Sequence, residues 1–163
     1  MTYEEQLQPL VAVAIAAALG AVTGLEREFA DKPAGLRTHM FVCSASALLV
    51  LLGDGVIDRF QSEDIGSVST DPTRIIQAIV VGISFLGAGT IVHHQDRQVE
   101  GLTTASSILF TAGIGIAVAI GQLILAAGAT ILAALILVVV GRVEKQIALR
   151  AAKRKEMNNK TSV

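Results

Sequence analysis

A short segment with charges of both signs lies between the first two apolar stretches of the sequence. It carries two carboxylates, three cations and, as its last residue, a histidine: Glu26, Arg27, Glu28, Lys32, Arg37 and His39. Carboxylates beside cations, with Pro33 and Gly35 shaping a turn, could bind an ion, a phosphate-bearing ligand or a loop of a partner protein. Alternatively, the cations only anchor neighbouring helices at a membrane surface, and Glu26 pairs with one of them.

Two threonines further along the chain are candidates for the same site. Thr103 and Thr104 open a later apolar stretch, where the free backbone N–H groups of an expected helix favour an anion. Thr103, Ser107 and Thr111 share a helical stripe that could line a polar path, although membrane-helix hydroxyls more often bond within their helix or to a neighbour. The candidate residues of this ligand- or partner-binding site are Glu26, Arg27, Glu28, Lys32, Arg37, His39, Thr103 and Thr104.

Carboxylates also surround the second apolar stretch at its far end. Asp54 lies within that stretch, where a charge costs roughly 2.5–3.5 kcal/mol at a helix centre and less near its end. Together with Asp71 and other acidic residues it could form a mouth that attracts a hard cation such as magnesium. The alternative is that Asp54 reaches the interface and pairs with Arg59 or Arg74. Asp54 and Asp71 are therefore the candidate metal ligands, and magnesium is the candidate ion.

The composition is typical of a membrane protein. Of 163 residues, 52% are hydrophobic and 17% are charged, and the mean hydropathy is +0.62, whereas soluble domains are about 25% charged. The single cysteine, Cys43, can form neither a disulfide framework nor a Cys/His zinc site. Because no catalytic triad, P-loop or dinucleotide fingerprint occurs, we expect no enzymatic activity. The basic C-terminal segment favours anionic lipid over nucleic acid.

Five apolar stretches of 18–20 residues predict five membrane-spanning helices, which would form an all-α polytopic bundle. The third begins with Asp71 as N-cap and Pro72 in its first turn. Gly20 and Gly24, four residues apart, indicate close helix packing. Residues 101–141 are uncharged and too long for one crossing, so we expect a tight turn at Gly121-Gln122. The predicted helices are residues 6–25, 40–57, 75–92, 102–120 and 123–141.

The distribution of basic residues predicts the orientation. All but two of the 13 Lys and Arg residues, Arg59 and Arg74, fall on one side of a five-helix topology. Short cytoplasmic loops are enriched in Lys and Arg, so we expect the N-terminus outside and the C-terminus in the cytoplasm. Residues 1–141 would form the transmembrane domain. Residues 142–163 would form a basic tail, with a short interfacial helix followed by disorder.

Several motifs occur together in one order and resemble the MgtC/SapB family over roughly residues 12–141. They are Gly24-Leu25-Glu26-Arg27-Glu28 and the segments at residues 32–39, 71–75, 82–89 and 101–105. The resemblance implies a bacterial inner-membrane protein, linked in some members to growth in low magnesium, survival in host cells and control of membrane potential through ATP synthase. Better-known members continue into an ACT-like regulatory domain, whereas here we expect the membrane module alone. At Thr103 and Phe110 the virulence-associated members have Asn and Cys.

Three functions are compatible with these features. The favoured one is a regulatory protein that binds another membrane complex, such as ATP synthase, and is linked to magnesium homeostasis or membrane potential. The second is a magnesium transporter or channel, which with five helices would require a homo-oligomer. The third is a module that binds lipid or a small anion through the first loop and the start of the fourth helix. Expected partners are the lipid bilayer and further copies of the chain.

Overall fold

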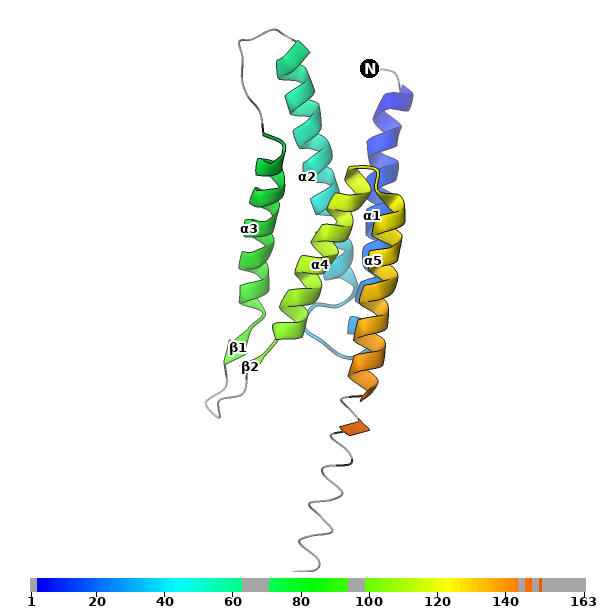
Figure 1. Cartoon of the computed structure of the whole chain (residues 1–163), viewed down its shortest axis with the longest axis vertical. Coiled ribbons are helices and arrows are strands. Elements are labelled where there is room, and N and C mark those ends of the chain that lie inside the picture. Colours follow the sequence, from blue (N-terminus) through cyan, green and yellow to red (C-terminus); the bar gives the residue numbers. More distant parts are fainter. Residues whose placement is uncertain (1–2, 63–70, 94–98, 144–145, 148–149, 151–163) are drawn as a thin grey trace, which may run out of the picture.

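The computed structural model describes residues 3–62, 71–93, 99–143, 146–147 and 150, and in these residues five helices form an elongated bundle (Figure 1). Two very short strands, β1 (Val92–His93) and β2 (Val99–Glu100), pair antiparallel between the third and fourth helices. Apart from this pair, the all-α prediction is confirmed. The helices are α1 (Tyr3–Phe29), α2 (Leu36–Ser62), α3 (Thr73–Gly89), α4 (Leu102–Ala119) and α5 (Leu123–Leu135), which continues as a π-helical segment, η1 (Ile136–Val140).

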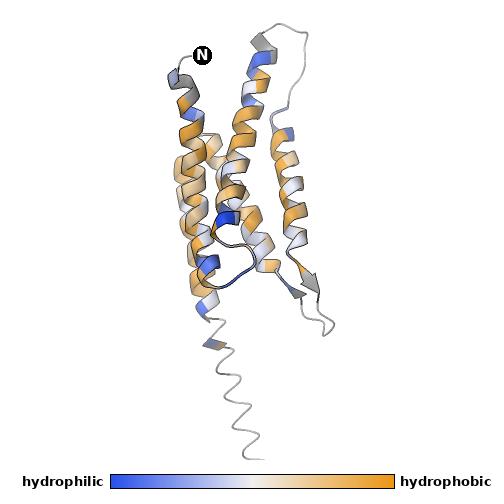
Figure 2. Ribbon diagram, turned by 180° about the vertical axis from the view of Figure 1, so that it is seen from behind, coloured by the Kyte–Doolittle hydropathy of each residue, from blue (hydrophilic) through white to orange (hydrophobic). Residues whose placement is uncertain are grey.

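The helices have the length and surface of membrane spans. Four described segments are long and apolar enough to cross a bilayer: Leu7–Phe29, Leu36–Arg59, Leu102–Ala119 and Leu123–Val143. With 17 residues, α3 would extend about 26 Å, the lower end of the usual range for a span. Figure 2 shows apolar residues along the helices and polar residues at their ends. Large apolar side chains such as Phe41 and Phe85 are exposed, as expected where lipid surrounds the bundle. The predicted helical membrane bundle is confirmed.

Helices α1, α2 and α4 form the core, and two glycines on α1 allow α2 to approach closely. A Cβ atom at Gly20 would lie 2.5 Å from the carbonyl oxygen of His39, and one at Gly24 would lie 2.8 Å from the Cα of Leu36. Neither position can accept a larger side chain unless α2 moves. The predicted packing function of Gly20 and Gly24 is therefore confirmed, and it brings the first turns of α2 against α1.

The sequence predicts the turn before α5 correctly and the start of α3 to within one residue, because Pro72 and not Asp71 holds the N-cap position. The predicted end of this helix at residue 92 is wrong, since α3 ends at Gly89 and Val92 belongs to β1. Asp71 accepts hydrogen bonds at Oδ1 from the backbone nitrogen and the hydroxyl of Thr73, at 2.9 and 2.7 Å. Gly121 has a positive φ of 77°, which a residue with a side chain rarely adopts. Beyond η1 the chain remains helical to Val143. Most of the predicted basic tail lies outside the described residues, so its interfacial helix stays a prediction.

The carboxylate of Asp71, just before α3, makes stability depend on pH. The hydrogen bonds from Thr73, and to a smaller extent the charge of Arg74, hold the pKa of Asp71 below its ordinary value. A carboxylate with a depressed pKa stabilises the fold above its unfolded pKa of about 3.9, and the contribution is lost as the pH falls through the folded value. Thermal unfolding at pH 7 should therefore show a lower midpoint for Asp71→Ala than for the native protein. The difference should shrink in acid, and a difference that does not change with pH would refute this account.

Candidate functional site

The predicted binding residues meet at one end of the bundle, where α1 ends and where α2 and α4 begin (Figure 1). They form two groups that differ in burial. Arg27, His39 and Thr104 are buried, and Glu26 is half-buried. The remaining four are exposed to the surroundings of the bundle: Glu28, Lys32, Arg37 and Thr103.

Arg27 connects α1 to α4. The residue is only 5% exposed, and Nη2 donates a hydrogen bond of 2.8 Å to the hydroxyl of Thr104, 77 residues away in sequence. The nearest carboxylate oxygen, Oε2 of Glu26, lies 4.0 Å from Nη1, the outer limit of an ion pair. The pairing of Glu26 with a neighbouring cation, expected as the alternative, is therefore present only in weak form. The positive charge of Arg27 is buried with little neutralisation.

His39 connects α2 to the same part of α4. Its fully buried ring places Nδ1 2.9 Å from the carbonyl oxygen of Gly35 and Nε2 3.1 Å from the hydroxyl of Ser107. Because a carbonyl oxygen can only accept, Nδ1 carries a proton. The Ser107 hydroxyl also lies 2.8 Å from the carbonyl oxygen of Thr104. Its one hydrogen is donated either to that carbonyl or, when the ring is neutral, to Nε2. Arg27, Thr104, Ser107 and His39 thus form one buried network that joins three helices.

Glu28 orders the loop between α1 and α2. Its Oε2 atom accepts a 2.9 Å hydrogen bond from the backbone nitrogen of Leu36, one of the N–H groups that have no partner within α2. Gly35 lies directly against this carboxylate, because a Cβ atom there would overlap Oε2 of Glu28. The structure thus gives Glu28 and Gly35 a local structural role. Lys32 in this loop and Arg37 in the first turn of α2 are exposed.

The buried hydroxyl stripe of α4 differs from the predicted one in its first member. Thr104, Ser107 and Thr111 are buried, whereas Thr103 is exposed. The prediction of Thr103 as part of the stripe is wrong, because neighbouring residues of a helix point about 100° apart and it is Thr104 that faces α1. Thr103 lies beside the site on its outer surface.

Several polar atoms in the α1–α2–α4 core have no hydrogen-bond partner. In the part of the chain that the structure describes, they are Thr23 Oγ1, Glu26 Oε2, Arg27 Nε, Ser46 Oγ and Thr111 Oγ1. Buried polar atoms of this kind usually bind ordered water. Sequence reasoning did not select Thr23 or Ser46, since a lone hydroxyl in an apolar run is a weak signal.

The two predicted metal ligands lie at the opposite end of the bundle. Asp54 is exposed near the end of α2, and Oδ1 of Asp71 is occupied by Thr73. Among the described residues, no three His, Cys, Asp or Glu side chains come together as a metal site would require. Glu63 and Asp64, which follow α2, lie outside the described residues. A magnesium site at this end therefore stays a prediction.

A bundle of exposed apolar helices with an ordered polar cluster at one end defines this chain as a polytopic membrane protein. The family model for the MgtC family matches residues 13–146. The chain belongs to the MgtC family, which confirms the resemblance found in its motifs.

Relatives from several bacteria support this assignment. The chain is 38% identical over 117 residues to protein MgtC of Salmonella typhimurium LT2, covering 70% of this chain and 44% of that protein. It is 39% identical over 108 residues to YhiD of Escherichia coli K12, whose name proposes magnesium transport, covering 66% of this chain and 48% of that protein. Protein SapB of Bacillus subtilis is 34% identical over 112 residues, covering 69% of this chain and 47% of that protein. The chain thus spans about half the length of the curated relatives it matches. No solved structure matches it.

Proposed function

We propose that this chain is a non-catalytic regulatory module of the bacterial inner membrane that binds another membrane protein. The supporting observation is the division of the site into two layers. The buried network of Arg27, Thr104, Ser107 and His39 fixes the ends of three helices. Around it lies what we term the exposed rim, formed by Phe29, Lys32, Arg37 and Thr103. Exposed side chains held on a rigid scaffold are the usual means of recognition.

The composition of the rim indicates the kind of partner it suits. Phe29 is 87% exposed at the last residue of α1, at the same end of the bundle as the exposed cations Lys32 of the loop and Arg37 of α2. An apolar ring and two positive charges at one end of the bundle suit a surface with acidic residues and an apolar patch. The excess of Lys and Arg on this side supports a cytoplasmic rim and an N-terminus outside.

The link to magnesium or membrane potential is part of the proposal and is supported by the relatives. MgtC itself is among them, and the name of YhiD proposes magnesium transport. ATP synthase is the candidate partner that the resemblance suggests, because control of membrane potential in some members runs through it. Regulation of such a complex requires contact at the rim and no ion path through the bundle.

The alternative function is magnesium transport. The positive charge of Arg27 would oppose the passage of a magnesium ion between α1, α2 and α4. A divalent cation about 6 Å from a guanidinium would be repelled by roughly 5 kcal/mol at an effective dielectric constant of about 20. Arg27 is buried at the entrance to this core, so the ion would have to pass it. Transport would therefore use an interface between copies of the chain, with exposed Asp54 as a candidate entry residue.

Cross-linking in membranes followed by affinity purification tests the proposed contact. A variant with both Lys32→Ala and Arg37→Ala should lose the copurified membrane protein, because the rim loses its charges while the buried network is unchanged. Arg59→Ala, which removes an exposed cation at the opposite end of α2, is the matched control and should retain it. Equal recovery with both variants, or loss with Arg59→Ala alone, would contradict the proposal.

A further inference from the structure

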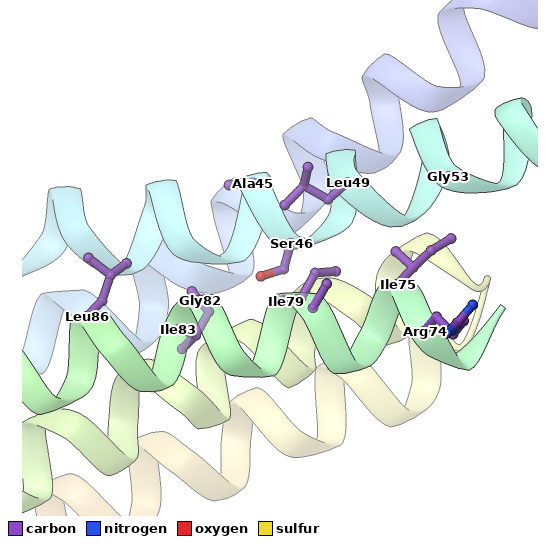
Figure 3. Close-up of a pocket in the computed structure, with 11 residues that line it drawn as sticks. Ala45, Ser46, Leu49, Gly53, Arg74, Ile75, Ile79, Gly82, Ile83 and Leu86 are labelled. Atoms are coloured by element: carbon purple, nitrogen blue, oxygen red, sulfur yellow. The ribbon is translucent and has the colours of Figure 1, made fainter. Parts of the chain in front are cut away.

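An open groove runs between α2 and α3, and all of its lining residues in the described part of the chain come from these two helices. Its volume is about 560 Å³, within the range of small-molecule sites. The two helices meet at one end, where a Cβ atom at Gly53 would overlap Ile75, while farther along α3 turns toward α4 and Gly87 packs against Ala105. Figure 3 shows the lining side chains between the helices, with Arg74 at the start of α3 and Leu86 toward its end.

We propose that this groove binds one acyl chain of an anionic phospholipid, whose phosphate is contacted by Arg74. The inference does not depend on the proposed regulatory function, because the groove shares no residue with the exposed rim. The lining is suited to hydrocarbon. Apart from Arg74 and the hydroxyl of Ser46, it is apolar, with the large side chains Leu49, Ile75, Ile79, Ile83 and Leu86.

The length of the groove matches one leaflet of a membrane. From Arg74 to Leu86 the helix rises about 18 Å, at 1.5 Å per residue. One leaflet contributes about 15 Å to the hydrocarbon core. A groove of this length can hold one acyl chain that enters at the interface beside Arg74.

The charge at the mouth of the groove matches a phosphate. Arg74 is exposed beside the N-terminus of α3, and in the described part of the chain its guanidinium makes no ion pair within 4.0 Å. Asp71 is the nearby carboxylate, and it is already hydrogen-bonded to Thr73. A guanidinium can bind two phosphate oxygens at once. An anionic head group would therefore be held at Arg74 while its chain lies along α3.

Native mass spectrometry of the purified protein with added phosphatidylglycerol or phosphatidylcholine tests this site. The native protein should retain phosphatidylglycerol about fivefold better, the effect of one cation near a membrane surface. Arg74→Gln should remove that preference. Arg59→Gln, an exposed cation at the same end that does not line the groove, should preserve it. Equal retention of both lipids by the native protein would overturn the proposal.

A second pair of variants tests the position of the acyl chain. Gly82 lines the groove, and a Cβ atom there meets nothing within 4 Å, so Gly82→Leu should fold and fill the groove. It should remove the retained phosphatidylglycerol, whereas Gly128→Leu, at an equally open position on α5, should not. Unchanged retention in Gly82→Leu would overturn the proposal. So would a lower oligomeric state of Gly82→Leu than of the native protein, which would identify a second copy as the occupant.

Discussion

Replacing Gly115 by alanine is expected to lower the unfolding temperature, whereas the same replacement at Gly113 is expected to leave it unchanged or raise it slightly. A Cβ atom at Gly115 would overlap the carbonyl oxygen of Cys43 and lie 3.1 Å from the Cβ of Ser46. A backbone carbonyl cannot move unless α2 moves, and such overpacking costs typically about 1–3 kcal/mol. At Gly113 nothing lies within 4 Å, so the methyl group only improves helix propensity.

The chain provides its own probe for this measurement. Cys43 is the single cysteine and is fully buried, so a thiol-reactive fluorescent dye labels it only when the α1–α2–α4 core opens. A thermal ramp with the dye should give a lower midpoint for Gly115→Ala than for Gly113→Ala. Equal midpoints would show that α2 and α4 are not in close contact at Gly115.

Removing Arg27 is expected to destabilise the protein through the loss of its hydrogen bond to Thr104. Hydrogen bonds from charged groups contribute about 1.5–3 kcal/mol, and Arg27→Ala also removes the packing of the side-chain stem. The same substitution relieves the cost of burying the guanidinium. For this reason the coupling energy, rather than the effect of either single substitution, measures the contact.

A double-mutant cycle of Arg27→Ala and Thr104→Val isolates this contact. We expect a coupling energy of about 1.5–3 kcal/mol from dye-monitored unfolding in denaturant. Arg37→Ala, at an exposed position, is the control and should change stability by less than about 0.5 kcal/mol. Additive effects of the Arg27 and Thr104 substitutions would refute the buried network.

Much of the fold could be predicted from the sequence because hydropathy determines where a chain crosses a bilayer. The second helix was predicted at residues 40–57 and extends over Leu36–Ser62. Hydropathy underestimates it because helices continue beyond the hydrocarbon, and here the carboxylate of Glu28 binds the first N–H group of α2. The turn at Gly121 was predictable because one polar break in a long uncharged run left no other place for it.

The arrangement within the site was less predictable. Arg27 and Arg37 are the same residue type in one charged segment, yet one is buried and the other exposed. Arg27 is buried because α1 is rotated so that this side chain faces Thr104 of α4, which is 77 residues away. The rotation of one helix relative to another cannot be read from a single sequence. Thr103 and Thr104 present the same problem, since helix phase alone decides which of them faces α1.

We propose that this chain binds a partner and does not conduct magnesium. Purified protein in liposomes that contain a magnesium-sensitive dye tests it directly, with an ionophore added at the end to verify the response. Under an inward magnesium gradient, we expect the same dye signal as in protein-free liposomes. A faster rise that is reduced by Asp54→Asn or Glu26→Gln would contradict the claim and identify the protein as a magnesium transporter.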